Sequence, residues 1–254
     1  MGSDVLGQIT TLAYAEIANR VYNIDVKGER SADGRWVVGD FDSALFKEGM
    51  SWGATNTDFK GCVYVSKSYK EAVVAFQGTV PKKGGDLLAD LQIAIGGLVG
   101  MLPQYCDAAT RLYDRTRQVY PEHQISFVGH SLGGAMAQVM GHWTGMPFVT
   151  FNAPGMWGDI QKAKLVPWSR GAQVRSIAGT LQGSLLSKQM ASTGRNFRNV
   201  MDPVSAYGFH YGPVTRFWGA GLHSMDDLEA RIRGSTRWRS VNPFDPANKE
   251  WGEL

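Results

Sequence analysis

Cysteine and long apolar runs are both scarce in this chain. Its 254 residues include two cysteines, Cys62 and Cys106, which lie far apart and outside any CxxC or Cys/His cluster. This spacing excludes a disulfide framework and a zinc site. It leaves open the possibility of a single disulfide between the two cysteines. The longest apolar stretch, residues 93–102, has about half of the roughly 20 residues that a membrane-spanning helix needs. We therefore expect a chain that does not cross a membrane.

Charge is also sparse and nearly balanced. The sequence has 26 Lys and Arg against 23 Asp and Glu, a net charge of +3 that does not by itself predict a nucleic-acid partner. A content of 43% hydrophobic residues excludes a disordered chain, and the lack of an internal repeat excludes solenoids and fibres. Residues 1–22 lack the basic segment and apolar run of a secretory signal, so the sequence predicts a cytoplasmic protein.

Strands and helices are predicted to alternate along the chain. Strands are expected at 62–66, 72–76, 125–128, 148–151, 174–177 and 197–200. Helices are expected within the first 22 residues and at 104–120, 132–143, 158–164 and 224–233. This alternation predicts one α/β domain over residues 1–254, with a mostly parallel central sheet flanked by helices on both faces and an irregular tail at 242–254. Residues 23–60 are expected to be irregular or short-stranded. Active sites of such sheets lie on loops beyond the carboxyl ends of the strands.

The pentapeptide G-x-S-x-G occurs twice, around Ser51 and around Ser131. A nucleophile elbow requires a buried strand that runs through a tight turn directly into a helix. Only Ser131 lies between such elements, the predicted strand 125–128 and the predicted helix 132–143. The context predicts Ser131 as the nucleophile of an α/β-hydrolase fold, and the alternative interpretation is a tight turn without chemistry.

A serine hydroxyl needs a base, and in this fold class the acid and the base follow the serine in the order Ser, Asp/Glu, His. His223 precedes a predicted helix that Ser224 can cap, so it lies on a loop that can reach a neighbouring strand end. His210 is flanked by aromatic residues, which is typical of a packed histidine. We predict His223 as the base and keep His210 as the rival. His130, next to Ser131, is expected to point away.

The acid is predicted to be Asp202. This aspartate ends an apolar strand just before Pro203, which marks the exit of a strand into a loop at the catalytic edge. Its carboxylate would orient the His223 ring and stabilise the imidazolium. Asp159 is the rival, although its context is more typical of a helix start.

The oxyanion of the reaction needs two preorganised hydrogen-bond donors. One is the backbone N–H of the residue after the nucleophile, here Leu132. The second should come from the end of an earlier strand, and the turn Gly78-Thr79 follows the predicted strand 72–76. The sequence therefore predicts an oxyanion hole from Thr79 and Leu132, with a simple turn as the alternative at 78–79.

Six short motifs follow one another in a specific order. They are Phe76–Thr79 (FQGT), Ala89–Leu91 (ADL), Gly129–Ala135 (GHSLGGA), Phe151–Gly155 (FNAPG), Asn199–Val204 (NVMDPV) and His223–Met225 (HSM). Together the motifs resemble the class 3 lipase family, the fungal-type triacylglycerol lipases with their plant and bacterial relatives. The resemblance implies a Ser131, Asp202 and His223 triad without a metal or cofactor. Gln77 stands where this family usually has arginine.

The interval between the oxyanion strand and the next helix is apolar and glycine-containing. In the class 3 lipases a lid occupies this place, so the resemblance implies a lid at residues 92–103. The side chains expected to contact substrate there are Ile93, Ile95, Leu98, Val99 and Leu102. A packed core segment is the alternative interpretation.

These features predict a serine lipase or esterase that hydrolyses lipid carboxyl esters. The substrate would be an acylglycerol or a phospholipid cut as by a phospholipase A1. Small bacterial members of the family include antibacterial effectors exported by dedicated secretion machines, so an exported effector with a cognate immunity protein is an alternative. A catalytically silent lipid-binding module and an acyltransferase are two further alternatives. The oligomeric state is not predicted.

Overall fold

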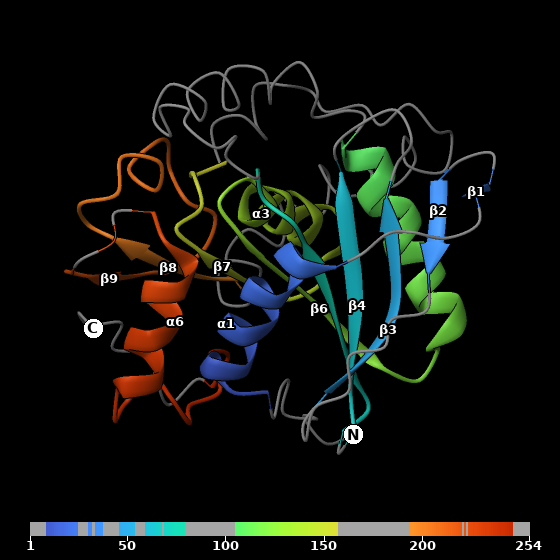
Figure 1. Ribbon diagram of the computed structural model, residues 1–254, viewed down its shortest axis with the longest axis horizontal. Helices are drawn as coiled ribbons and strands as arrows, with labels where there is room; N and C mark the ends of the chain where they lie inside the picture. Colours follow the sequence, from blue (N-terminus) through green and yellow to red (C-terminus); the bar gives the residue numbers. More distant parts are fainter. Residues whose placement is uncertain are drawn as a thin grey trace.

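The strands that the structure describes form one nine-stranded sheet (Figure 1). The computed structural model describes residues 9–24, 30–31, 34–37, 46–53, 59–67, 69–79, 105–156, 194–219, 221 and 223–245. The strands follow the chain order and are β1 (Arg30–Ser31), β2 (Gly34–Val37), β3 (Phe46–Gly53), β4 (Lys60–Ser66), β5 (Glu71–Phe76), β6 (Gln124–His130), β7 (Phe148–Phe151), β8 (Gly194–Asn199) and β9 (Val214–Phe217). The helical elements are α1 (Thr11–Arg20), the short 3₁₀ helix η1 (Val21–Asn23), residues 105–119, α3 (Leu132–Thr144) and α6 (Met225–Gly234).

The sheet has an antiparallel half and a parallel half. Each pair from β1 to β5 is antiparallel, and each pair from β5 to β9 is parallel. The predicted α/β class is therefore confirmed, and the strands expected at 125–128, 148–151 and 197–200 lie in the parallel half. This half places the carboxyl ends of β5 to β9 at one edge of the sheet, where a site is expected.

Some predicted elements differ from the structure or lie beyond its description. The region expected to be irregular or short-stranded contains the eight-residue strand β3. The sequence does not predict strand β9. Its four residues include Thr215 and Arg216, and they are too few to show an alternation of apolar and polar side chains. The predicted helix at 158–164, the strand at 174–177 and the lid at 92–103 fall outside the described residues.

Apolar side chains cover both faces of the parallel strands, and each face has its own core. Helices α1 and α6 pack together on one face, whereas α3 and the helix over 105–119 cover the other (Figure 1). Cys62 is buried in the first core and Cys106 in the second, and no disulfide joins them. Among the described residues, no helix is long and apolar enough to cross a membrane.

Candidate active site

A strained turn joins β6 to α3 at the predicted nucleophile. Ser131 has φ 57° and ψ −128°, a conformation that non-glycine residues rarely adopt. Its backbone N–H donates to Phe151 O at 3.0 Å, and its carbonyl accepts from Ala135 N–H at 3.1 Å. A strained serine between a strand and a helix is what a nucleophile elbow requires, and the two hydrogen bonds connect it to the end of β7 and to the first turn of α3.

Small residues let the elbow pack tightly against the sheet. A Cβ added to Gly133 would overlap the backbone carbonyl of Phe76 on β5, and one added to Gly129 would overlap Gly133. Because all these atoms belong to backbone, no side-chain rotation could relieve the overlap. The glycines that flank Ser131 therefore fix how closely α3 approaches β5.

Gly133→Ala should lower the free energy of unfolding by about 3 kcal/mol, a cost at the upper end for overpacking a filled site. Urea denaturation monitored by circular dichroism would measure it. Gly234→Ala, at the end of α6, is the matched control, because a Cβ there meets nothing within 4 Å. Equal stability of the two variants would contradict the tight contact between α3 and β5.

The predicted acid and base form a hydrogen-bonded pair. His223 Nδ1 lies 2.9 Å from Asp202 Oδ2, and Asp202 is fully buried. The carboxylate also accepts from Val204 N–H at 3.0 Å and from Ser205 N–H at 3.3 Å. These backbone donors hold the carboxylate in place, and its contact with the ring favours the His223 tautomer with the proton on Nδ1. The second ring nitrogen, Nε2, is then available as a proton acceptor.

The second ring nitrogen of His223, Nε2, is buried and has no hydrogen-bond partner among the described residues. The ring packs beside the elbow, with its centroid 4.7 Å from that of His130 and the two planes at 38°. The hydrogen bond between Asp202 and His223 is thus formed, whereas His223 Nε2 and the Ser131 hydroxyl are not hydrogen-bonded to each other. Catalytic hydrogen bonds often tighten only when substrate binds.

His130 corrects one expectation from the sequence. Its side chain does not point away from the site but lies against His223, and its Nδ1 is 2.8 Å from the hydroxyl of Tyr22. The pleat explains this, because His130 shares a strand face with Val128, and α1 and α6 cover that face. Burial, and then the neighbouring His223, hold the pKa of His130 well below its usual value. A neutral His130 adds no positive charge beside His223 when that ring takes up a proton.

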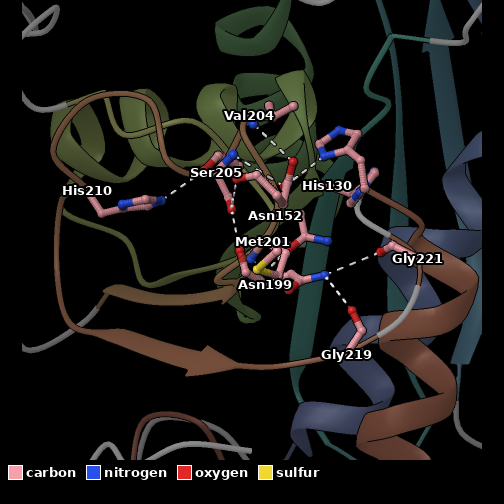
Figure 2. Close-up of polar contacts among 12 residues, drawn as sticks. His130, Asn152, Asn199, Met201, Val204, Ser205, His210, Gly219 and Gly221 are labelled. Carbon is pink, nitrogen blue, oxygen red and sulfur yellow. Dashed lines mark hydrogen bonds and ion pairs between the residues drawn. The ribbon is translucent and has the colours of Figure 1, made fainter. Parts of the chain in front are cut away.

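Two asparagines tie together the loops that carry the acid and the base. Asn152, which follows β7 with φ 45°, accepts from Asn199 N–H at 2.8 Å. The Asn199 amide donates to Gly219 O at 3.3 Å and to Gly221 O at 3.4 Å (Figure 2). One line of hydrogen bonds therefore runs from the end of β7 through β8 to the loop before His223. Sequence reasoning assigned these amides no role, although both lie within the quoted motifs.

The end of β5 lies beside the elbow, as an oxyanion hole requires. A Cβ added to Gly78 would lie 3.2 Å from the Cβ of Ser131, so the backbone of Gly78 approaches the nucleophile closely. Thr79 is the next residue along the chain, and its part in the oxyanion hole stays a prediction. Leu132 begins α3, and first-turn N–H groups of a helix have no intrahelical acceptor. Gln77 fastens this strand end to η1, because its Nε2 donates to Val21 O at 3.3 Å and to Tyr22 O at 3.2 Å.

The rival residues lie elsewhere. Ser51 is inside β3, in register with Cys62, and not at a strand-to-helix turn. His210 Nε2 lies 2.9 Å from Ala153 O, and burial is the main cause that lowers its pKa to about 4. His210 is thus a packed histidine. Asp159 and the five predicted lid residues lie outside the described residues.

In the described ranges, no three His, Cys, Asp or Glu side chains form a group that could hold a metal ion.

The partly buried His210 should make the fold sensitive to acid. The folded pKa of about 4 lies below the unfolded value near 6.5, so the unfolded chain binds this proton first as the pH falls. The stabilising contribution is complete above pH ~6.5 and is lost as the pH falls toward 4. At pH 5 the expected loss is about 2 kcal/mol. Urea unfolding at pH 7.5 and at pH 5 would measure this loss in the free energy of unfolding. In His210→Gln the decline between the two pH values should be smaller by this amount. An equal decline in both proteins would contradict the low pKa of His210.

Comparison of the sequence with known proteins places most of the chain in one family. The family model of the Tle-like phospholipase domain matches residues 13–204. A relative from Mycosarcoma maydis named "Putative lipase ATG15" is 28% identical over 188 residues, which cover 60% of this chain and 34% of the relative. A relative of the same name from Candida albicans is 26% identical over 196 residues, covering 60% and 32%. The chain thus spans about a third of the length of these curated relatives.

Solved structures of fungal lipases also show similarity. The Lip2 lipase of Yarrowia lipolytica is 18% identical, with a TM-score of 0.43 over 78% of this chain and 76% of that one. A triacylglycerol lipase of Penicillium expansum is 16% identical, with a TM-score of 0.39 over 83% and 79%.

Proposed function

The chain belongs to the family of Tle-like phospholipase domains, and from this premise we propose that it is a serine hydrolase that cleaves carboxyl esters of lipids. The observation that carries the proposal is the buried Asp202–His223 pair, whose ring packs beside the strained Ser131 elbow. An ionised acid, an oriented imidazole and a strained serine have complementary roles in acyl transfer.

The proposed reaction proceeds through an acyl-enzyme. His223 Nε2 takes the proton of the Ser131 hydroxyl as its oxygen attacks the ester carbonyl, and the backbone N–H groups of Leu132 and Thr79 donate to the oxyanion. His223 then gives its proton to the leaving alcohol. Water attacks the acyl-enzyme while His223 removes a proton from the water. His223 then returns this proton to the Ser131 oxygen as the bond to the acyl group breaks, which releases the fatty acid and restores the hydroxyl. Asp202 stays ionised and stabilises the imidazolium throughout.

We propose a glycerophospholipid as the substrate, cut at an acyl ester in the manner of a phospholipase A1, with acylglycerols as the alternative. The family description supports the phospholipid. The test uses purified protein with phosphatidylglycerol and, separately, triacylglycerol, each with different chains at sn-1 and sn-2, and mass spectrometry of the products. The expected products are the sn-1 fatty acid and a 2-acyl lysophospholipid. Release from triacylglycerol alone would overturn the phospholipid assignment.

The alternatives from the sequence give different products in the same assay. A silent lipid-binding module would bind vesicles and release no fatty acid. An acyltransferase would move the acyl chain to an acceptor other than water. Both outcomes contradict hydrolysis and can be read in the same mass spectra.

An exported antibacterial role is a separate proposal. The sequence resemblance to a family that includes such effectors supports it, and the expected partner is an immunity protein that blocks the site. Expression directed to the periplasm of sensitive bacteria should arrest growth and convert phospholipids to lysophospholipids. Unchanged growth and unchanged phospholipids would contradict the role without affecting the hydrolase proposal.

A further inference from the structure

Exposed apolar side chains are concentrated at one margin of the sheet. Six large hydrophobic side chains are exposed among the described residues, and four of them lie between residues 201 and 218. These four are Met201 (56% exposed), Tyr207 (43%), Phe209 (78%) and Trp218 (52%). The first three belong to the loop that carries Asp202, and Trp218 directly follows β9. The exposure is therefore next to the candidate site.

Two arginines lie side by side at the same margin. Arg198 on β8 and Arg216 on β9 are register partners in a parallel pair, so their side chains point to the same face of the sheet. Like charges placed opposite each other are destabilising. Within the described ranges no acidic side chain forms an ion pair with either arginine, and Arg198 Nε is buried without a hydrogen-bond partner. Asp202 attracts Arg198, but its carboxylate is already bonded to His223.

The arginines and the apolar loop adjoin each other. Asn196 shares a face of β8 with Arg198, and its amide donates to Tyr211 O at 2.8 Å and to Gly212 O at 3.3 Å. The loop that includes Phe209 therefore lies over this face. After burial, the charges of Arg198 and Arg216 also contribute to the low pKa of His210, the residue next to Phe209. Figure 1 shows β9 at the outer edge of the sheet, and Figure 2 shows Met201 and His210 on the loops around Asn199.

We propose that this margin, which we call the β8–β9 patch, docks on the surface of a bilayer that contains anionic phospholipids. The patch consists of Arg198, Met201, Tyr207, Phe209, Arg216 and Trp218. Its aromatic side chains would enter the region of the headgroups, where Trp and Tyr are favoured, and its arginines would donate to lipid phosphates. The inference rests on the proposed function, because the Asp202 loop would then hold the site at the lipid surface.

Other occupants fit the patch less well. A second copy of this chain would oppose its own arginine pair, which adds repulsion between like charges. The other basic and aromatic stretch of the sequence, residues 231–239, has different partners. Trp238 is buried against Phe197, and Arg233 pairs with Glu16 and Glu229. The β8–β9 patch thus combines exposed apolar side chains with two arginines that form no ion pair with any acidic side chain the structure describes.

The test measures vesicle binding in a protein that cannot turn lipid over. In the Ser131→Ala background, we expect co-sedimentation with vesicles of phosphatidylcholine and phosphatidylglycerol, and weaker binding to phosphatidylcholine alone. Arg216→Glu, and separately Phe209→Ser with Trp218→Ser, should each weaken binding to the mixed vesicles about tenfold or more. Tyr69→Ser and Arg239→Glu are the matched controls, since both side chains are exposed outside the patch, and they should bind as the parent does.

The experiments distinguish an error in the docking proposal from an error in the proposed hydrolase function. With Ser131 restored, the patch variants should hydrolyse a soluble short-chain nitrophenyl ester at the rate of the wild type. Binding that is unchanged in both patch variants would overturn the docking proposal, whatever the ester assay shows. Loss of binding only in Arg216→Glu, together with competition by inorganic phosphate, would also overturn it and leave a simple anion site. A wild type inactive on the soluble ester would instead contradict the proposed hydrolase.

Discussion

Replacing Ser131 with alanine should lower kcat/KM for lipid esters about 10⁶-fold, the scale of loss when the nucleophile of a serine hydrolase is removed. Without the hydroxyl no acyl-enzyme can form, and the oxyanion hole and substrate binding alone retain only a small residual rate. The strained backbone at this position stays compatible with alanine, because serine occupies it already. The loss should therefore appear in the kinetics and not in the unfolding curve.

Ser51→Ala provides the matched control, since Ser51 is the central residue of the second G-x-S-x-G pentapeptide. It lies within an antiparallel strand, so its replacement should leave turnover and labelling by a fluorophosphonate probe intact. Labelling that survives Ser131→Ala and disappears in Ser51→Ala would reverse the assignment of the nucleophile.

His223→Ala should cost nearly as much as the loss of the serine. In triads the nucleophile and the base act as a unit, so removing either removes most of the rate, about 10⁶-fold in kcat. The Asp202 carboxylate would keep its bonds from Val204 and Ser205, which limits the effect on folding. Initial rates on a soluble ester, together with fluorophosphonate labelling, would measure the loss of a base that activates Ser131.

The rival histidine supplies the control for this variant. His210→Ala removes a bond to Ala153 O and should lower stability, but turnover at pH 8 should remain close to that of the wild type. Full activity in His223→Ala, or loss of activity in a folded His210→Ala protein, would exchange the roles of the two histidines.

The sequence predicted those parts of the molecule that depend on local signals. The strand, tight turn and helix around Ser131 could be recognised because glycine spacing and apolar periodicity act over a few neighbouring residues. The helix start at α6 was equally local, and Ser224 accepts from Asp227 N–H as its cap. The chain order of acid and base then limited the candidates to residues that the structure brings together as Asp202 and His223.

The parts that escaped prediction depend on contacts between distant segments. Strand β9 is too short to show a period, and its place is fixed by pairing with β8. The orientation of His130 follows from which helices cover its strand face, and one of its partners, Tyr22, is more than a hundred residues away. The roles of Asn152 and Asn199 depend on loops whose proximity exists only after folding. A single sequence contains no local signal for such pairs.

The hydrogen bonds of Asn152 and Asn199 link the proposed base to a strand at one end of the described sheet. Among the strands that the structure describes, β9 is the last in the sheet, and outer strands open more readily than central ones because they have one neighbour fewer. Asn199 bonds to Gly219 and Gly221, so fraying of β9 would release the segment that holds His223 while β5 to β7 remain paired. Thermal inactivation would then begin at this outer strand, by loss of alignment between base and serine, before the central core melts.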